Sequence, residues 1–241
     1  MIQPQQPDIS GQEPHSLPHL QAIIWDLDGV IVDTSDQHRR SWQQLAAETG
    51  VTFTDEDFWR TFGRSNAAII PLHWGADLSP EQIAALADRK EVIFRALLRD
   101  NLHALPGALE LLQAAHTAGL KQSLASSAPL ENISLILDLL NLHRWLDAIV
   151  SGDRLPHGKP APDIFLLAAE RLSIAPAQCV VIEDAPAGVA AAKAAGMACL
   201  AVTNSHPASA LADADRIVAS LEEVHLADLA DIVPQIHQTE R

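Results

Sequence analysis

The chain has 241 residues, of which 48% are hydrophobic, so it can bury a sizeable core as one large domain or as one domain with a smaller insert. Sixteen lysines and arginines against 31 aspartates and glutamates give a formal net charge of −15, which opposes binding to nucleic acids and to anionic lipid surfaces. No stretch reaches about 18 apolar residues without a charge, so no membrane span is expected.

Residues 1–19 are rich in glutamine and proline and have neither the basic start nor the apolar stretch of a signal peptide, so we expect a mobile tail and a cytoplasmic protein. Cys179 and Cys199 lie beside apolar, strand-like runs and show no metal-binding or redox spacing. They are predicted to be small buried core residues.

The first predicted element is a buried strand over residues 22–25, which ends in two carboxylates, Asp26 and Asp28. Gly29 follows and lets the backbone turn sharply. The two acids could simply cap a turn. Carboxylates this close also repel one another unless a cation lies between them or one keeps a proton, so the alternative is a metal site or an acid/base pair.

Residues 36–101 show helical patterns and no convincing strand, which predicts an all-helical insert. Thr34 or Ser35 is expected to cap a helix that runs to about residue 49 and stops at Gly50, and a second helix is expected over residues 65–73. Ser79, followed by proline and then Gln82, forms a capping box that opens a long helix to about residue 99.

Beyond residue 102 strands and helices alternate, which is typical of a parallel α/β fold. Residues 20–35, which include the first predicted strand, and residues 102–241 should therefore form one α/β core. The predicted strands cover residues 122–125, 148–150, 180–182 and 198–202, with a last one near Ile217. The predicted helices cover residues 106–119, 130–140, 162–172 and 187–195, with a terminal one near Leu221.

Polar residues follow the predicted strands, and in open parallel sheets those strand ends border the ligand crevice. Ser126 and Ser127 follow one strand, residues 151–153 the next, and Glu183 with Asp184 a third. With Asp26, these acids form an oxygen-rich cluster that suits Mg²⁺, although Glu183 and Asp184 could instead cap a helix. Lys159, in a proline-rich loop, is either solvated or held as a point charge that faces a phosphate oxygen or a nucleophilic carboxylate.

In their order along the chain, Asp26-Leu27-Asp28-Gly29, Ser126, Lys159-Pro160 and Glu183-Asp184 resemble the four motifs of the haloacid dehalogenase superfamily of phosphatases and phosphotransferases. The resemblance implies a Rossmann-like parallel sheet core with a small all-helical cap domain inserted after the first strand. It implies that Asp26 is a nucleophile that forms an aspartyl-phosphate and that Asp28 is the general acid/base. It assigns Mg²⁺ to Asp26, Asp28, Glu183 and Asp184, and the transferring phosphoryl group to Ser126, Ser127 and Lys159.

The chain looks most similar to the group that includes β-phosphoglucomutase and sugar-phosphate phosphatases, and His38 matches a histidine of that group. Two departures weaken the mutase interpretation: the cap segment has Arg64 before Ser65 and Asn66, and Ala128 and Leu130 replace polar residues after Ser126. We therefore expect a monomeric, Mg²⁺-dependent phosphatase that acts on a small phosphorylated metabolite. His38, Arg64 and Asn66 of the cap are expected to contact this substrate. The alternatives are a β-phosphoglucomutase and a non-catalytic binding module.

Overall fold

The computed structural model describes residues 19–61, 64–100 and 102–234. The tail expected over residues 1–19 therefore lies outside the described residues, except for His19, as do Gly63 in the cap segment and residues 235–241. In the described parts of the chain, no helix combines the length and the hydropathy that a membrane crossing needs.

The described chain folds around one parallel sheet with the strand order β3-β2-β1-β4-β5-β6. The strands are β1 (Ala22–Trp25), β2 (Lys121–Ser126), β3 (Ala148–Ser151), β4 (Cys179–Glu183), β5 (Ala198–Val202) and β6 (Arg216–Val218). The chain adds β2 and β3 on one side of β1 and then β4 to β6 on the other. The direction of strand addition reverses between β1 and β4, which is where such sheets bind ligands.

Both faces of the sheet are buried, which explains why the central strands are continuously apolar. Ile23 and Trp25 belong to the hydrophobic cluster on one face, and Ala22 and Ile24 to the cluster on the other. The first face is covered by α5 (Ala108–Thr117), α6 (Leu130–Leu140) and α9 (Leu226–Ile232), and the second by α7 (Asp163–Leu172) and α8 (Pro186–Ala194).

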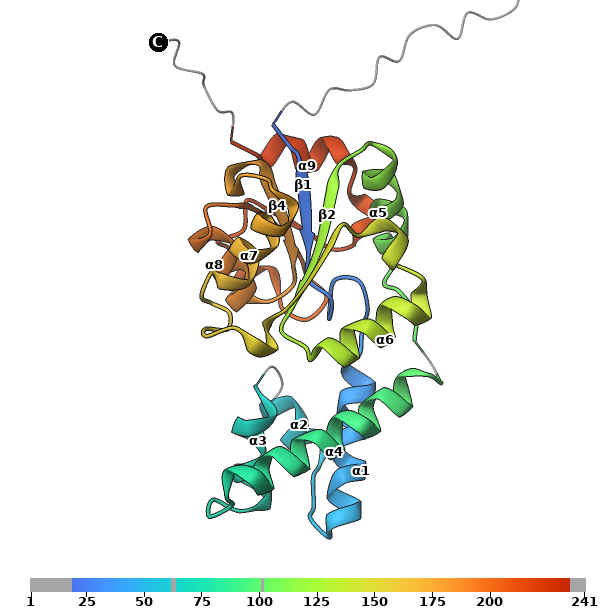
Figure 1. The fold of residues 1–241 in the computed structure, drawn as a ribbon, viewed down its shortest axis with the longest axis vertical. Helices are drawn as coiled ribbons and strands as arrows, with labels where there is room; N and C mark the ends of the chain where they lie inside the picture. Colours follow the sequence, from blue (N-terminus) through green and yellow to red (C-terminus); the bar gives the residue numbers. More distant parts are fainter. Residues whose placement is uncertain (1–18, 62–63, 101, 235–241) are drawn as a thin grey trace, which may run out of the picture.

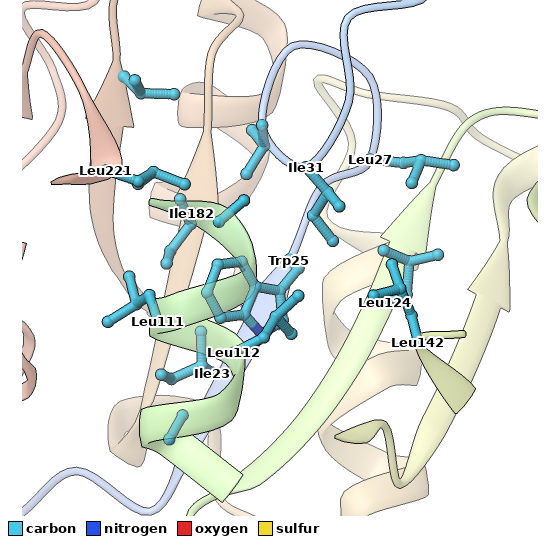
Figure 2. Close-up of a cluster of buried hydrophobic side chains, with 14 of the residues drawn as sticks. Ile23, Trp25, Leu27, Ile31, Leu111, Leu112, Leu124, Leu142, Ile182 and Leu221 are labelled. Atoms are coloured by element: carbon cyan, nitrogen blue, oxygen red, sulfur yellow. The ribbon is translucent and has the colours of Figure 1, made fainter. Parts of the chain in front are cut away.

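Trp25 lies at the centre of the first cluster, close to Leu111 and Leu112 of α5 (Figure 2). Its indole Nε1 donates a hydrogen bond to Gln122 Oε1 at 3.0 Å, so the one polar atom of this buried ring is satisfied. The fully buried strand that ends at Asp26 is thereby fixed in register with β2 and β4.

A separate helical unit stands beyond the carboxyl ends of the strands (Figure 1). We use this name for α1 (Ser35–Thr49), α2 (Asp55–Thr61), α3 (Asn66–Trp74) and α4 (Pro80–Leu98). The unit has its own hydrophobic core, built from Trp42, Leu45, Phe53, Phe58, Ile69, Ile70 and Ile93 among others. The two connections between this unit and the sheet lie side by side, because Val32 and Ala104 form an antiparallel bridge and Leu105 N donates to Ile31 O at 2.8 Å.

The predicted elements agree with the structure apart from three details. Gly50 ends α1 in a left-handed conformation and Ser79 with Gln82 caps α4, both as predicted. Thr34 occupies the cap position of α1, but its hydroxyl bonds Asp28 instead of the helix. The short helix α2 was not predicted, and Leu221 begins a 3₁₀ turn, whereas the terminal helix starts at Leu226.

Candidate active site

Asp26 lies at the point where the order of strands reverses. It directly follows β1, its N–H donates to Ile182 O of β4 at 3.0 Å, and only 7% of its surface is exposed. The register that pairs Trp25 with Ile182 brings the next residues, Asp26 and Glu183, to the same edge of the sheet. Burial at this edge results from two apolar strands that end together.

Lys159 links Asp26 to Glu183. Its Nζ donates to Asp26 Oδ1 at 2.5 Å and to Glu183 Oε1 at 2.6 Å, and the lysine side chain is 10% exposed. Burial alone disfavours the ammonium, but the two carboxylates outweigh it and raise the pKa of Lys159. Lys159 is therefore a fixed positive charge that faces the Asp26 carboxylate, and its contact with a phosphate stays a prediction.

The Glu183 carboxylate is held from both sides. Its Oε1 accepts from Lys159, and its Oε2 accepts from the backbone N–H groups of Asp184 and Ala185 at 2.8 and 2.9 Å. Gly188 in the first turn of α8 makes room for it, because a Cβ there would lie 1.7 Å from Glu183 Oε1. Glu183 thus positions Lys159 and also bonds the backbone that leads into α8.

Asp26, Glu183 and Asp184 form a buried carboxylate cluster, with one oxygen from each within 4.8 Å of the others. Burial raises the pKa of Asp26 well above its usual range, against the opposing charge of Lys159. Burial and the charge of Glu183 likewise raise the pKa of Asp184. One lysine does not balance three carboxylates, and a hard divalent cation with oxygen ligands would, so the donor set fits Mg²⁺.

Asp28 and Gly29 shape the loop beside this cluster. Burial raises the pKa of Asp28, although a hydrogen bond from the Thr34 hydroxyl opposes the shift. Gly29 has φ +82°, and a Cβ on it would lie 1.8 Å from Asp184 Oδ2. A glycine is therefore required here both for the backbone conformation and for the close approach of Asp184.

The two predicted phosphate-binding serines lie at the end of β2, which neighbours β1. Ser126 is buried, and its Oγ accepts from the N–H of Ala128 at 3.1 Å, which leaves its hydroxyl proton free to point elsewhere. Ser127 is exposed. Both residues stay predicted phosphate ligands.

The three predicted cap residues have different surroundings. His38 on α1 stacks on Phe94, with ring centroids 4.0 Å apart, and its Nδ1 lies 2.7 Å from Lys90 Nζ. Asn66, at the start of α3, donates to Glu91 Oε1 at 2.7 Å, whereas Arg64 is exposed. His38 and Asn66 thus belong to one polar cluster of the helical unit, and Arg64 stands apart from it.

Three residues of the loop after β5 contact this site and were missed in the sequence. Asn204 Nδ2 donates to Gly29 O at 2.8 Å, the Ser205 hydroxyl bonds the Asp184 side chain, and His206 Nδ1 lies 3.2 Å from Asp184 O. The loop therefore supports both the turn after β1 and the outermost carboxylate. The signal was available, because these residues follow a predicted strand as the other site residues do.

Comparison with known proteins places the chain among relatives of this architecture. A family model described as haloacid dehalogenase-like hydrolase matches residues 20–196. The chain is 36% identical to a fructose-1-phosphate phosphatase, YqaB, of Escherichia coli K12 over 181 residues, which are 73% of this chain and 92% of that protein. It is 34% identical to β-phosphoglucomutase of Bacillus subtilis 168 over 216 residues, which cover 86% of this chain and 92% of the relative.

A similar solved structure is a mutant of CbbY from Rhodobacter sphaeroides in complex with xylulose-(1,5)bisphosphate. It has a TM-score of 0.79 and 28% sequence identity, and the match covers 87% of this chain and 99% of that one. The fold, the strand-end cluster and these matches agree, and the chain belongs to the haloacid dehalogenase-like hydrolases.

Proposed function

We propose that this chain is a Mg²⁺-dependent phosphatase that hydrolyses a small phosphorylated carbohydrate through an aspartyl-phosphate on Asp26. The observation that carries the proposal is the contact of Lys159 with both Asp26 and Glu183 at the end of β1, beside Asp184. A buried carboxylate, a fixed cation and a cluster of further carboxylates are the parts that phosphoryl transfer to a carboxylate needs.

Asp26 and Asp28 share the chemistry in two steps. In the first, an Asp26 carboxylate oxygen forms a bond to phosphorus while the bond from phosphorus to the ester oxygen breaks, and Asp28 gives that oxygen a proton. In the second, Asp28 takes a proton from water, the water oxygen attacks phosphorus, and the Asp26 carboxylate is released. The raised pKa of the buried Asp28 side chain suits it to hold the proton that the first step requires.

Lys159 and the two serines hold the phosphoryl group. The Lys159 ammonium lies against Asp26 and is available to a phosphoryl oxygen at the same place, where it offsets the negative charge of both groups. Ser126 offers a hydroxyl proton, and the exposed Ser127 offers a second donor at the mouth of the crevice.

Mg²⁺ would be held by Asp26, Asp184, the backbone carbonyl of Asp28 and Glu183, and when bound it supplies Lewis-acid stabilisation of phosphoryl oxygens. Glu183 already accepts hydrogen bonds on both oxygens, so its part in the set is the weakest of the four. The unbalanced charge of Asp26 and Asp184 supports this ligand set.

The helical unit, which corresponds to the insert predicted over residues 36–101 and begins one residue earlier, at Ser35, acts as the cap domain that excludes water and selects the substrate. Its position beyond the strand ends supports this role (Figure 1). Within it we assign contacts with the sugar to His38, Arg64 and Asn66. Because Asn66 already bonds Glu91, its amide contributes through its remaining hydrogen-bonding capacity.

A β-phosphoglucomutase is the second candidate, favoured by the 34% identity with the Bacillus subtilis enzyme. Both candidates use the same aspartyl-phosphate and differ in whether water or a sugar hydroxyl accepts the phosphoryl group. Ala128 and Leu130 after Ser126, and Arg64 as the exposed cation of the cap segment, favour water as the acceptor.

The test is a panel of sugar phosphates with Mg²⁺, in which inorganic phosphate and isomerised sugar phosphate are both measured. We expect release of phosphate from at least one small phosphorylated carbohydrate. Formation of glucose 6-phosphate from β-glucose 1-phosphate with a bisphosphate primer would instead identify a mutase. No Mg²⁺-dependent turnover across the panel would leave the non-catalytic module as the answer.

The proposal includes a monomer that works in the cytoplasm. The location, but not the monomeric state, is supported by the two free, buried thiols Cys179 and Cys199, whose pKa values burial raises, so neither is set up for disulfide exchange.

A further inference from the structure

A buried polar cluster joins the helical unit to α6 of the α/β core, and two of its members, Glu91 and Asn132, have no part in the chemistry described above. Its centre is a pair of neighbours on α4: Lys90, 1% exposed, and Glu91, 8% exposed, with Lys90 Nζ 2.9 Å from Glu91 Oε1. Buried charges of this kind are expensive unless they are paired and hydrogen-bonded. Because Lys90 and Glu91 are buried at the junction of two hydrophobic cores in spite of this cost, we infer that they serve a function there.

The two oxygens of Glu91 bind different parts of the molecule. Oε1 accepts from Lys90 and from Asn66 of α3 at 2.7 Å, both within the helical unit. Oε2 accepts from Asn132 Nδ2 of α6 at 2.6 Å, and Asn132 is 1% exposed. A single carboxylate therefore bridges the helical unit and the α/β core.

Arg95 fixes the orientation of the Asn132 amide. Arg95 NH1, one turn further along α4, donates to Asn132 Oδ1 at 2.8 Å, which leaves Nδ2 as the atom that faces Glu91. Both oxygens of Glu91 and both polar atoms of the Asn132 side chain have partners, so the contact specifies one docking of α4 on α6 and not merely a close approach.

The same cluster reaches the crevice through Lys90. Lys90 Nζ lies 2.7 Å from His38 Nδ1, and its charge and that of Glu91 both act on the Asp28 carboxyl. Lys90 also lies over the rings of Phe94 and Trp42, at 4.9 and 5.5 Å from their centroids. Its ammonium is thus held between aromatic walls, with Glu91 as its carboxylate partner.

We propose that Glu91 and Asn132 are positioning residues that dock the helical unit on the core in one orientation and, by the same hydrogen bonds, hold Lys90 and His38 beside the crevice. The hydrogen bonds that dock the helical unit therefore also place the Lys90 ammonium near Asp28. The effect on turnover rests on the proposed phosphatase function, but the docking itself does not.

An exchange of the two partners tests this geometry. Glu91→Gln alone places the new amide nitrogen, a donor, opposite Asn132 Nδ2, which is also a donor. If the Asn132 amide turned over to avoid this, its nitrogen would face the donating guanidinium of Arg95 instead. Asn132→Asp alone sets two carboxylates against each other. In the double variant the new amide donates to the new carboxylate, its oxygen still accepts from Lys90 and Asn66, and Arg95 keeps its acceptor.

Two measurements test the effect of these substitutions. Spin labels at Asp88→Cys on α4 and Leu139→Cys on α6, both exposed positions, report the distance between the helical unit and the core without substrate. Steady-state hydrolysis reports kcat/KM. Each single variant should broaden the distance distribution and lower kcat/KM by about tenfold, the effect of one buried group left unpaired. The double variant should recover the distance distribution and exceed both single variants in kcat/KM, and Glu131→Gln, the same change at an exposed site on α6, should alter neither quantity.

Single variants with the distance distribution of the parent protein, or a double variant no better than the singles, would overturn the proposal. If no phosphate ester is turned over by the parent protein, the proposed function fails, and the distance measurement still decides the docking. Thermal melting of each single variant shows whether it stays folded at the assay temperature, and activity lost by a folded single variant is not lost folding.

Discussion

The Asp26 carboxylate lies near one cation, Lys159, and two other carboxylates, Glu183 and Asp184. Its substitution therefore tests catalysis and folding separately. An amide at this position keeps the size of the side chain and can still accept from Lys159 Nζ, while it removes one of three crowded negative charges. The residue is buried because two apolar strands end there, and not because its charge stabilises the fold.

Asp26→Asn should abolish phosphate release and leave the melting temperature unchanged or higher. The reason is that the amide is no nucleophile and the buried carboxylate is a cost to the fold. Phosphate release with saturating Mg²⁺ and thermal melting check the two halves. Asp153→Asn, at the end of β3 and exposed, is the matched control, and near-normal turnover by Asp26→Asn would contradict the assigned nucleophile.

Ser205 bonds the side chain of Asp184, which is one of the proposed Mg²⁺ ligands. Loss of its hydroxyl in Ser205→Ala should weaken Mg²⁺ binding by about 10- to 100-fold, as is typical for partners that orient a metal ligand. Calorimetric titration with Mg²⁺ measures this without turnover. Ser205→Thr, which keeps a hydroxyl, should bind almost normally, and so should Ser209→Ala at an exposed site nearby; equal affinity of Ser205→Ala and the parent would exclude the role.

At the scale of elements, sequence patterns predicted the buried strands well, because five of the six have short apolar runs bounded by turns. The short helix α2, Asp55–Thr61, was missed since it is mostly polar and carries only Phe58 as a fully buried apolar residue. Thr34 was expected to cap α1, but Asp28 lies within reach only in the folded turn and takes its hydroxyl.

The candidate site and its surroundings likewise contain contacts that the sequence could predict and contacts that it could not. Residues at strand ends could be identified because the edge of a parallel sheet collects them, and Asp26 and Glu183 do meet there, joined by Lys159 from a loop. The contact between Glu91 and Asn132 could not, since it depends on how two helices distant in sequence pack. A sequence shows that Lys90 and Glu91 are adjacent, not that both are buried.

Gly188 in α8 offers a test at this scale. Glycine to alanine usually stabilises a helix by up to about 1 kcal/mol. Here the new Cβ would enter the space of the Glu183 carboxylate and displace Lys159 with it. Gly188→Ala should therefore fold but lose about a hundredfold in kcat/KM, the effect of a misplacement of about 1 Å. Ala187→Ser, exposed in the same turn, should have normal activity, and a normal Gly188→Ala enzyme would contradict this account.

For the whole molecule, the buried carboxylates make stability depend on pH and on metal. Burial and the charge of Glu183 raise the pKa of Asp184 from 3.8 to about 7. Between these values the folded protein binds more protons than the unfolded chain, so this group lowers the free energy of unfolding as the pH rises. His38, whose pKa burial lowers, acts in the opposite sense below about pH 6.5, so a comparison between variants is needed.

Without metal, Asp184→Asn should gain stability over the parent protein as the pH rises from 5 to 8, by at most about 1.4 kcal/mol for each pH unit. The contribution of His38 cancels in the difference. With saturating Mg²⁺ the order should reverse, because only the parent gains the free energy of metal binding. Urea unfolding at several pH values, with chelator or with Mg²⁺, measures both, and a difference that does not change with pH would contradict the raised pKa.

The bridge between Val32 and Ala104, outside the strands of the sheet, brings the two segments that lead into and out of the helical unit together. A segment whose ends meet can be exchanged for another of different length without a change in the register of β1 or β2. Selection can therefore alter the helical unit while the strand ends that carry Asp26 and Asp184 stay as they are. We expect that grafting the corresponding segment of a relative between these two joints transfers substrate preference, which makes this chain a modular scaffold for new phosphate esters.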